Sequence, residues 1–87
     1  MTKEQLKEII DSGNRHFIYF YSPWCRACRR MSYLVDREKT PLTRVNGEEE
    51  TEILQAFGIE YYPTIVEIKG NTKKVHAGTD SVRKLLK

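Results

Sequence analysis

Both cysteines of the chain lie in the segment Trp24-Cys25-Arg26-Ala27-Cys28, separated by two residues. The segment follows an unbroken apolar and aromatic run at residues 17–21 and a Ser-Pro pair that favours the start of a helix. If a helix begins near Ser22 or Trp24, Cys25 occupies its first turn and Cys28 lies one turn later on the same face. Helix residues three apart have Cβ atoms roughly 5–6 Å apart, so a disulfide between them opens and closes with little backbone movement.

The expected position of Cys25 also favours its ionised form. Backbone N–H groups and the positive end of the helix dipole stabilise an anion at the start of a helix. The thiolate is the attacking form of cysteine in disulfide exchange. The spacing therefore predicts an available nucleophile at Cys25 and a partner thiol at Cys28, one turn away.

Three other interpretations compete with a redox site. Structural zinc needs four protein ligands, yet the chain has no second cysteine pair. His16 cannot easily help, because it starts the strand that delivers Cys25 and is about 16 Å away at ~3.3 Å per residue. A structural disulfide would close a loop too short to constrain the unfolded chain much, and the third alternative is coincidence. The strand–CxxC–helix context favours redox chemistry without a metal.

The composition fits one globular domain over residues 1–87. No apolar stretch is long enough to span a membrane, and the first residues lack the apolar core of a signal peptide. We therefore expect a cytoplasmic protein, since a lone CxxC in a reducing compartment is reactive rather than structural. The net charge of +3 comes from basic residues spread along the chain, which makes nucleic acid a weak hypothesis. The expected form is a monomer without nucleic-acid or membrane partners.

Residue patterns in the first half of the chain predict a helix, a strand, a second helix and a second strand. The apolar spacing of residues 2–11 fits an amphipathic helix, and the apolar run at 16–21 fits a strand buried on both faces. The second helix is expected from Cys25 to about Lys39, closed by Pro41, with a brief strand at 42–46. A strand–helix–strand crossover of this length implies two parallel strands.

The second half predicts a helix, a β-hairpin and a final helix. Acidic residues 48–50 suit the start of a helix. Residues 64–69 and 73–76 are expected to pair as antiparallel strands, and the last helix begins at Thr79 or Asp80. The two halves together predict an α/β domain with a four-stranded mixed sheet flanked by helices.

With this order in place, the chain resembles the thioredoxin family. The matching segments are residues 20–28 with Trp-Cys-x-x-Cys, residues 58–64 with a Pro-Thr pair opening a strand, the turn at 69–71, and Gly78. The resemblance covers most of the chain from Phe17 onward. It implies a compact thioredoxin fold in which the strand that often precedes the first helix is absent.

The resemblance implies a thiol–disulfide oxidoreductase that needs no cofactor beyond its cysteines. It makes Cys25 the nucleophile, Cys28 the resolving thiol and Pro63 a cis proline packed against them. The residues that it places in active-site support or on the substrate-binding surface are Trp24, Arg26, Ala27, Tyr61, Tyr62, Thr64, Gly78 and Thr79.

The same resemblance suggests partners. Protein disulfides as substrates and a protein reductase as the electron source are preferred. Glutathione is the alternative reductant, because the Gly-Thr-Asp start of the last helix also resembles the turn that holds glutathione in glutaredoxins. A docking module that uses the fold without redox chemistry is an alternative of another class.

Departures from the family pattern concern proton transfer and charge near the cysteines. Thioredoxins usually carry a buried aspartate where this chain has Tyr19, and the usual lysine partner corresponds to Arg44. We expect Tyr19 to be a packed core residue with a satisfied hydroxyl rather than a proton carrier. The arginines Arg26, Arg29 and Arg30 add positive charge that favours a nearby thiolate, although an exposed helix face explains the last two equally well.

Overall fold

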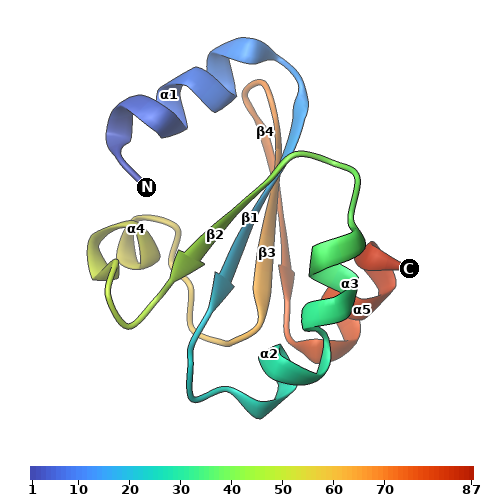
Figure 1. Cartoon of the computed structure of the whole chain (residues 1–87). Coiled ribbons are helices and arrows are strands. Elements are labelled where there is room, and N and C mark those ends of the chain that lie inside the picture. The colour runs from blue at the N-terminus through green and yellow to red at the C-terminus, as the bar shows by residue number, and fades with distance from the viewer.

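The computed structural model describes residues 1–87, and a four-stranded sheet forms the centre of the molecule (Figure 1). The strands are β1 (Arg15–Tyr21), β2 (Leu42–Asn46), β3 (Thr64–Lys69) and β4 (Thr72–Ala77). Their order across the sheet is β2-β1-β3-β4. β1 runs parallel to β2 and antiparallel to β3, which pairs antiparallel with β4. The predicted mixed sheet is therefore confirmed.

Helices cover both faces of this sheet. They are α1 (Lys3–Ser12), α2 (Arg26–Arg30), α3 (Ser32–Arg37), α4 (Thr51–Ala56) and α5 (Thr79–Leu86). In Figure 1, α1 and α4 lie on one side of the sheet and α2, α3 and α5 on the other. None of these helices has both the length and the apolar character needed to cross a bilayer.

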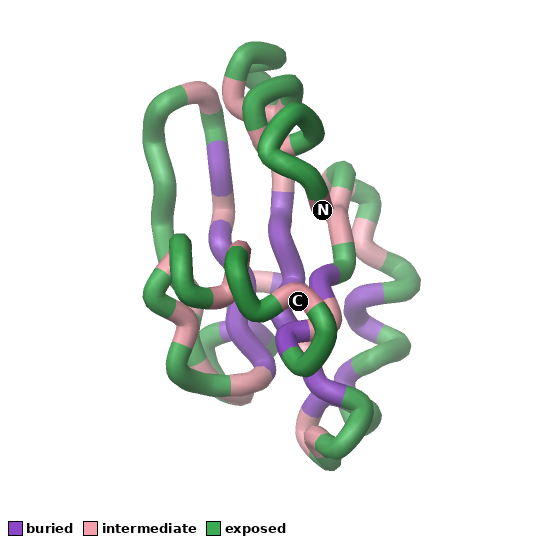
Figure 2. The backbone as a smooth tube through the Cα atoms, turned by 90° about the vertical axis from the view of Figure 1, so that its left-hand side faces the viewer, coloured by how far each residue is buried: buried purple, intermediate pink, exposed green.

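Two hydrophobic cores result from this arrangement, one on each face of the sheet. Successive side chains of a strand point to opposite faces, so Phe17 and Tyr19 join the core under α3 and α5, whereas Ile18 and Phe20 join the core under α1 and α4. Figure 2 shows the buried backbone concentrated in the central strands. β1 is thus buried on both faces, as its apolar run predicts.

The predicted helix from Cys25 to about Lys39 is wrong as a single helix. α2 ends at Arg30 and α3 begins at Ser32, with Met31 at φ −103° and ψ 8° between them. Met31 is fully buried, and the Ser32 hydroxyl donates a hydrogen bond of 2.9 Å to the carbonyl of Arg29. Such a local side-chain bond competes with the helical pattern. The break lets α2, which carries Cys28, take a direction different from that of α3, which packs on the sheet.

The acidic run at 48–50 leads into α4, whose N-cap residue is Glu50. Asn46 organises these residues into a turn: its side-chain oxygen accepts the N–H of Glu48 at 3.0 Å. Its carbonyl accepts the N–H groups of Glu49 at 3.1 Å and Glu50 at 2.9 Å. The prediction of a helix start at this acidic run is therefore confirmed at Glu50, whereas Glu48 and Glu49 belong to the preceding turn.

Candidate active site

Cys25 lies where the chain leaves β1 and enters α2. It is the N-cap residue of α2, with φ −84° and ψ 110°, and so stands just before the first turn in which it was expected. Its sulfur accepts a hydrogen bond from the backbone N–H of Cys28 at 3.1 Å. Hydrogen bonds to an ionised group are stronger than neutral ones, so this contact favours a negative charge on the Cys25 sulfur. Both cysteines are free thiols.

Ser22 fixes the loop that carries Cys25. Its hydroxyl accepts the N–H of Trp24 at 3.2 Å and donates to the Glu48 carboxylate at 3.2 Å. Its carbonyl accepts the N–H of Cys25 at 3.1 Å, and the side chain is buried. Our sequence analysis used Ser22 only as a helix start; a serine at a strand–helix junction was the available signal for this role.

The sulfurs of Cys25 and Cys28 differ in their exposure to solvent. Cys28 is buried, whereas Cys25 is partly exposed. Burial, followed by the hydrogen bond with Cys25, raises the pKa of Cys28 to about 11. Cys28 therefore keeps its proton at neutral pH. The two thiols therefore differ in their access to solvent, as a nucleophile and a resolving thiol must.

Pro63 lies directly before β3 and is the proline that the family resemblance expects to be cis. The Tyr62–Pro63 peptide bond is cis, and Pro63 is fully buried. Its carbonyl accepts the N–H of Gly78 at 2.9 Å, which ties the start of α5 and the adjoining Thr79 to this loop. Thr64 is also buried, and its hydroxyl donates to the carbonyl of Tyr61 at 2.7 Å. The Thr64 side chain therefore lies behind the expected substrate surface rather than on it.

Tyr62 is held by a glycine that sequence analysis missed. A Cβ atom added at Gly47 would lie 2.1 Å from the Tyr62 hydroxyl oxygen. Burial, then the charges of Glu48 and Cys28, raise the pKa of Tyr62. The Tyr62 ring therefore packs directly against the backbone of Gly47 and close to both groups. No motif in the sequence pointed to Gly47.

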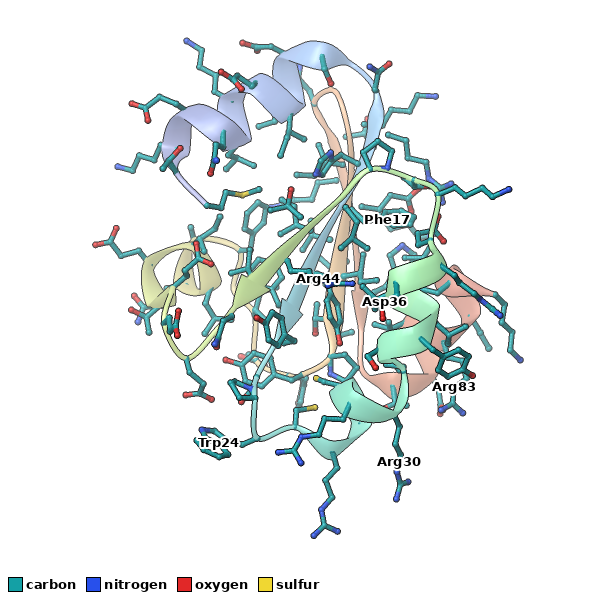
Figure 3. All side chains as sticks on the ribbon, viewed as in Figure 1. Phe17, Trp24, Arg30, Asp36, Arg44 and Arg83 are labelled. Atoms are coloured by element: carbon teal, nitrogen blue, oxygen red, sulfur yellow. The ribbon has the colours of Figure 1, made fainter.

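Two large aromatic side chains near the cysteines are open to solvent. Trp24 is 78% exposed and Tyr61 is 63% exposed, and Figure 3 shows Trp24 projecting from the loop before α2. Arg26 is exposed beside them, and Ala27 is half-buried.

The two remaining arginines of α2 differ in their contacts. The Arg29 guanidinium donates two hydrogen bonds to the carbonyl of Pro23, at 2.8 and 3.2 Å. Arg30 is exposed and projects away from the molecule (Figure 3). Arg29 therefore clamps α2 to the loop before Cys25, a role that neither of the two expected explanations included.

Tyr19 is buried in the core, as expected, but the prediction of a satisfied hydroxyl is wrong. Its hydroxyl oxygen has no hydrogen-bond partner. Its neighbour across the β1–β2 register, Arg44, instead pairs with Asp36 at the surface. The physical reason is packing: the Tyr19 ring stacks on Tyr21, with centroids 5.7 Å apart and planes at 17°, which fixes where its hydroxyl points.

A metal site receives no support from the structure. No three His, Cys, Asp or Glu side chains are grouped so that they could hold an ion. His16 lies within 2.8 Å of the Thr43 hydroxyl instead. The reactive atoms described at the site are the two sulfurs of Cys25 and Cys28. Opening and closing a bond between two sulfurs moves two electrons, which is the reaction of thiol–disulfide oxidoreductases.

Comparison with known proteins agrees with this class. The sequence model described as Thioredoxin matches residues 1–87, and the chain belongs to the thioredoxin family. The thioredoxin of Griffithsia pacifica is 31% identical over 85 residues, covering 91% of this chain and 77% of that protein. Thioredoxin 1 of Nostoc sp. is 30% identical over 73 residues, covering 77% of this chain and 68% of that protein. The protein is thus a thiol–disulfide oxidoreductase.

More distant similarities concern the fold. The structure of Fasciola hepatica thioredoxin aligns with a TM-score of 0.79 at 18% identity, covering 95% of this chain and 89% of that chain. Protein disulfide-isomerase A4 of Rattus norvegicus is 24% identical over 74 residues, but the match covers only 12% of that protein. These matches show that the compact sheet and its helices form a thioredoxin fold.

Proposed function

We propose that the protein reduces disulfide bonds of other proteins through a reversible disulfide between Cys25 and Cys28. The observation that carries this proposal is the difference between the two sulfurs. Cys25 is partly exposed and accepts the Cys28 N–H, whereas Cys28 is buried and protonated. The pair needs no further cofactor for this reaction.

The reaction has two steps. The Cys25 thiolate attacks one sulfur of the substrate disulfide, forming a mixed disulfide and releasing one substrate thiolate. The Cys28 sulfur, after losing its proton to water, then attacks the Cys25 sulfur. The Cys25–Cys28 bond forms, and the second substrate thiolate leaves and takes up a proton. Two electrons pass from the protein to the substrate, and another reductant restores the dithiol.

The surface around Cys25 suits a polypeptide substrate. Trp24 and Tyr61 both offer exposed aromatic area to such a substrate. The backbone N–H and carbonyl of Tyr62 make no hydrogen bond within the protein, so they are free to pair with an extended chain. Gly78 and Thr79, held by the carbonyl of Pro63, complete this surface.

A protein reductase is the proposed electron source, because the same aromatic surface fits a protein better than a tripeptide. Glutathione is the second candidate, and the observation in its favour is the half-buried turn at Gly78 and Thr79 before α5. We place the reaction in a reducing, cytoplasmic setting and assign it to a monomer.

Single cysteine substitutions test the proposed mechanism. Cys28→Ser should trap mixed disulfides with protein substrates, seen as bands on a non-reducing gel that disappear with dithiothreitol. Cys25→Ser should abolish disulfide reduction and trap nothing. Normal turnover by Cys28→Ser, or a trap formed through Cys28 in Cys25→Ser, would contradict the assigned roles.

A further inference from the structure

The two layers of helices that cover the sheet carry opposite charge. Residues 26–44 and 79–87, which include α2, α3 and α5, hold nine basic and three acidic side chains. Residues 1–12 and 47–60, which include α1 and α4, hold two basic and eight acidic side chains. In Figure 1 these two groups of helices lie on opposite sides of the sheet. The outer surface of α2, α3 and α5 is therefore a basic face.

The charge of the basic face is left largely uncompensated within the protein. The one ion pair among its residues joins Arg44 to Asp36. Arg30 of α2 and Arg83 of α5 are exposed and have no acidic partner, and Figure 3 shows both on this side of the molecule. Unpaired like charges on one surface attract ligands of the opposite sign. The basic face is therefore suited to an anionic partner.

An exposed aromatic side chain belongs to the same face. Tyr33 of α3 is 60% exposed, and the Arg37 guanidinium carbon lies 5.5 Å from the centre of its ring. α3 and α5 pack side by side in one core, so the exposed Arg83 and Lys84 belong to the neighbouring helix. Tyrosine and arginine are enriched among the residues that contribute most to protein interfaces. The face therefore offers more than charge to a protein partner.

The basic face begins next to the reactive sulfur. α2 starts directly after Cys25, and α3 follows it after a single residue. Tyr33 is eight residues beyond Cys25, a path on the order of 12 Å at 1.5 Å per helix residue. A polypeptide whose disulfide lies at Cys25 can therefore also reach Tyr33. A nucleic acid would supply anions to this face but no disulfide to the thiols, whereas an acidic protein supplies both.

We propose that the part of the basic face formed by Tyr33, Arg37, Arg83 and Lys84 is a docking surface for an acidic segment of the proteins whose disulfides this protein reduces. This inference rests on the proposed function and names its substrate class: proteins with several Asp or Glu residues a short distance along the chain from the disulfide. Binding of that segment raises the local concentration of the disulfide at the Cys25 sulfur. The exchange reaction itself is unchanged.

Synthetic disulfides with different tails test this inference. Two short peptides are joined by one disulfide, with a fluorophore on one and a quencher on the other. A Gly-Ser linker of four residues, with a mean span of about 11 Å, connects the disulfide to a tail of six glutamates or six glutamines. The dithiol protein should reduce the glutamate-tailed peptide roughly tenfold faster at low salt. The ratio should fall as salt shortens the Debye length to about 8 Å.

Charge removal on and off the face separates docking from net charge. The triple variant Arg37→Gln, Arg83→Gln, Lys84→Gln should lose most of the preference for the glutamate tail and reduce the glutamine-tailed peptide at the original rate. The matched triple variant Lys3→Gln, Lys7→Gln, Lys69→Gln removes the same charge from exposed positions outside the face. It should keep the preference. Circular dichroism checks that both variants fold.

A cysteine-free peptide with the same linker and glutamate tail tests binding without the reaction. Amide signals of residues 33–37 and 83–87 should shift in its presence, whereas those of Trp24 and Cys25 should not. Oligothymidine with six phosphates provides the nucleic-acid comparison. Tighter binding of this oligonucleotide than of the glutamate tail to the same residues would assign the face to nucleic acid and overturn the inference.

The outcomes distinguish this inference from the proposed function. Equal rates with the two tails, equal losses in the two triple variants, or shifts confined to residues 24–26 overturn the inference alone. Failure of the unsubstituted protein to reduce the glutamine-tailed peptide refutes the proposed function. In that case the titration with the cysteine-free peptide still decides whether the face binds an acidic segment.

Discussion

At Gly47 the hydroxyl of Tyr62 occupies the space that any larger residue would need. The distance from an added Cβ to that oxygen is 2.1 Å, and two ring carbons follow at 2.7 Å. Tyr62 precedes Pro63, to which a cis peptide bond joins it. The glycine therefore holds part of the proposed substrate surface in place through the ring that packs on it.

Gly47→Ala should displace the Tyr62 ring and lower the free energy of unfolding by about 1–3 kcal/mol, the usual cost of overpacking. Reduction of a protein disulfide should slow more than reduction of a small disulfide, because only the former uses the Tyr62 surface. Urea denaturation and the two assays measure this. In a Tyr62→Ala background the same substitution should cost almost nothing; a cost that persists there would mean that the clash lies elsewhere.

Residue-scale chemistry could be predicted where it depends on residue type and spacing alone. Cys25 and Cys28 met this condition, because three positions along a helix bring two sulfurs together wherever the helix lies. The roles of Gly47 and Tyr19 did not. A close approach to Gly47 and an unpaired hydroxyl on Tyr19 depend on rings packed from other elements, and the sequence does not give those positions.

Among the elements, α2 is too short to hold itself in place. It has five residues, and isolated helices of this length are unstable in water. Two devices attach it: the Cys25 sulfur caps its start, and the Arg29 guanidinium binds the carbonyl of Pro23. The position of the reactive sulfur therefore depends on a side chain four residues further along the chain.

Arg29→Ala should loosen the loop before α2, whereas Arg30→Ala removes the same charge from the same helix without touching the loop. We expect Arg29→Ala to slow reduction of a small uncharged disulfide several-fold and to speed hydrogen exchange of the Trp24 and Cys25 amides. Arg30→Ala should change neither. Equal effects of the two substitutions would show that charge matters and that the clamp does not.

Among the elements, the bounds of the strands could be predicted from the sequence, whereas the break in the long helix could not. Strand patterns are set by alternation and apolar runs that each segment carries itself, so all four strands fell within a residue of their expected bounds. The break at Met31 depends on which core its side chain enters. Periodicity across residues 25–39 is compatible with one helix or two, and only the position of the sheet decides between them.

In the whole molecule, the net charge is only +3, but basic and acidic side chains predominate in different segments of the chain. Residues 26–44 carry six basic and two acidic side chains, whereas residues 47–60 carry five glutamates and no basic side chain. The first segment includes α2 and α3 and the second includes α4, on opposite sides of the sheet (Figure 1). The basic residues are spread along the chain as expected, whereas residues 47–60 hold only acidic charges, and Cys28 belongs to the basic segment in α2.

A protein reductase or an acidic target should approach from the side of α2. We expect a thioredoxin reductase to sustain turnover better than glutathione with its own reductase, and its rate to fall as salt shortens the Debye length from about 30 to about 8 Å. Arg30→Glu should lower that rate at low salt, whereas Glu49→Lys should not. Efficient turnover by glutathione alone would count against the protein reductase.

The cap at the start of α2 links electron transfer to folding. The Cys25 sulfur that accepts the Cys28 N–H in the dithiol is the atom that oxidation converts into half of a covalent bond. Any factor that stabilises the capped, reduced helix makes the folded protein hold its electrons more tightly than the unfolded chain does. Folding and oxidation together form a thermodynamic cycle. The difference in conformational stability between the oxidised and the reduced protein therefore equals the difference in redox affinity between the folded and the unfolded chain. The redox affinity of the thiol pair thus depends on the stability of the structure that surrounds it.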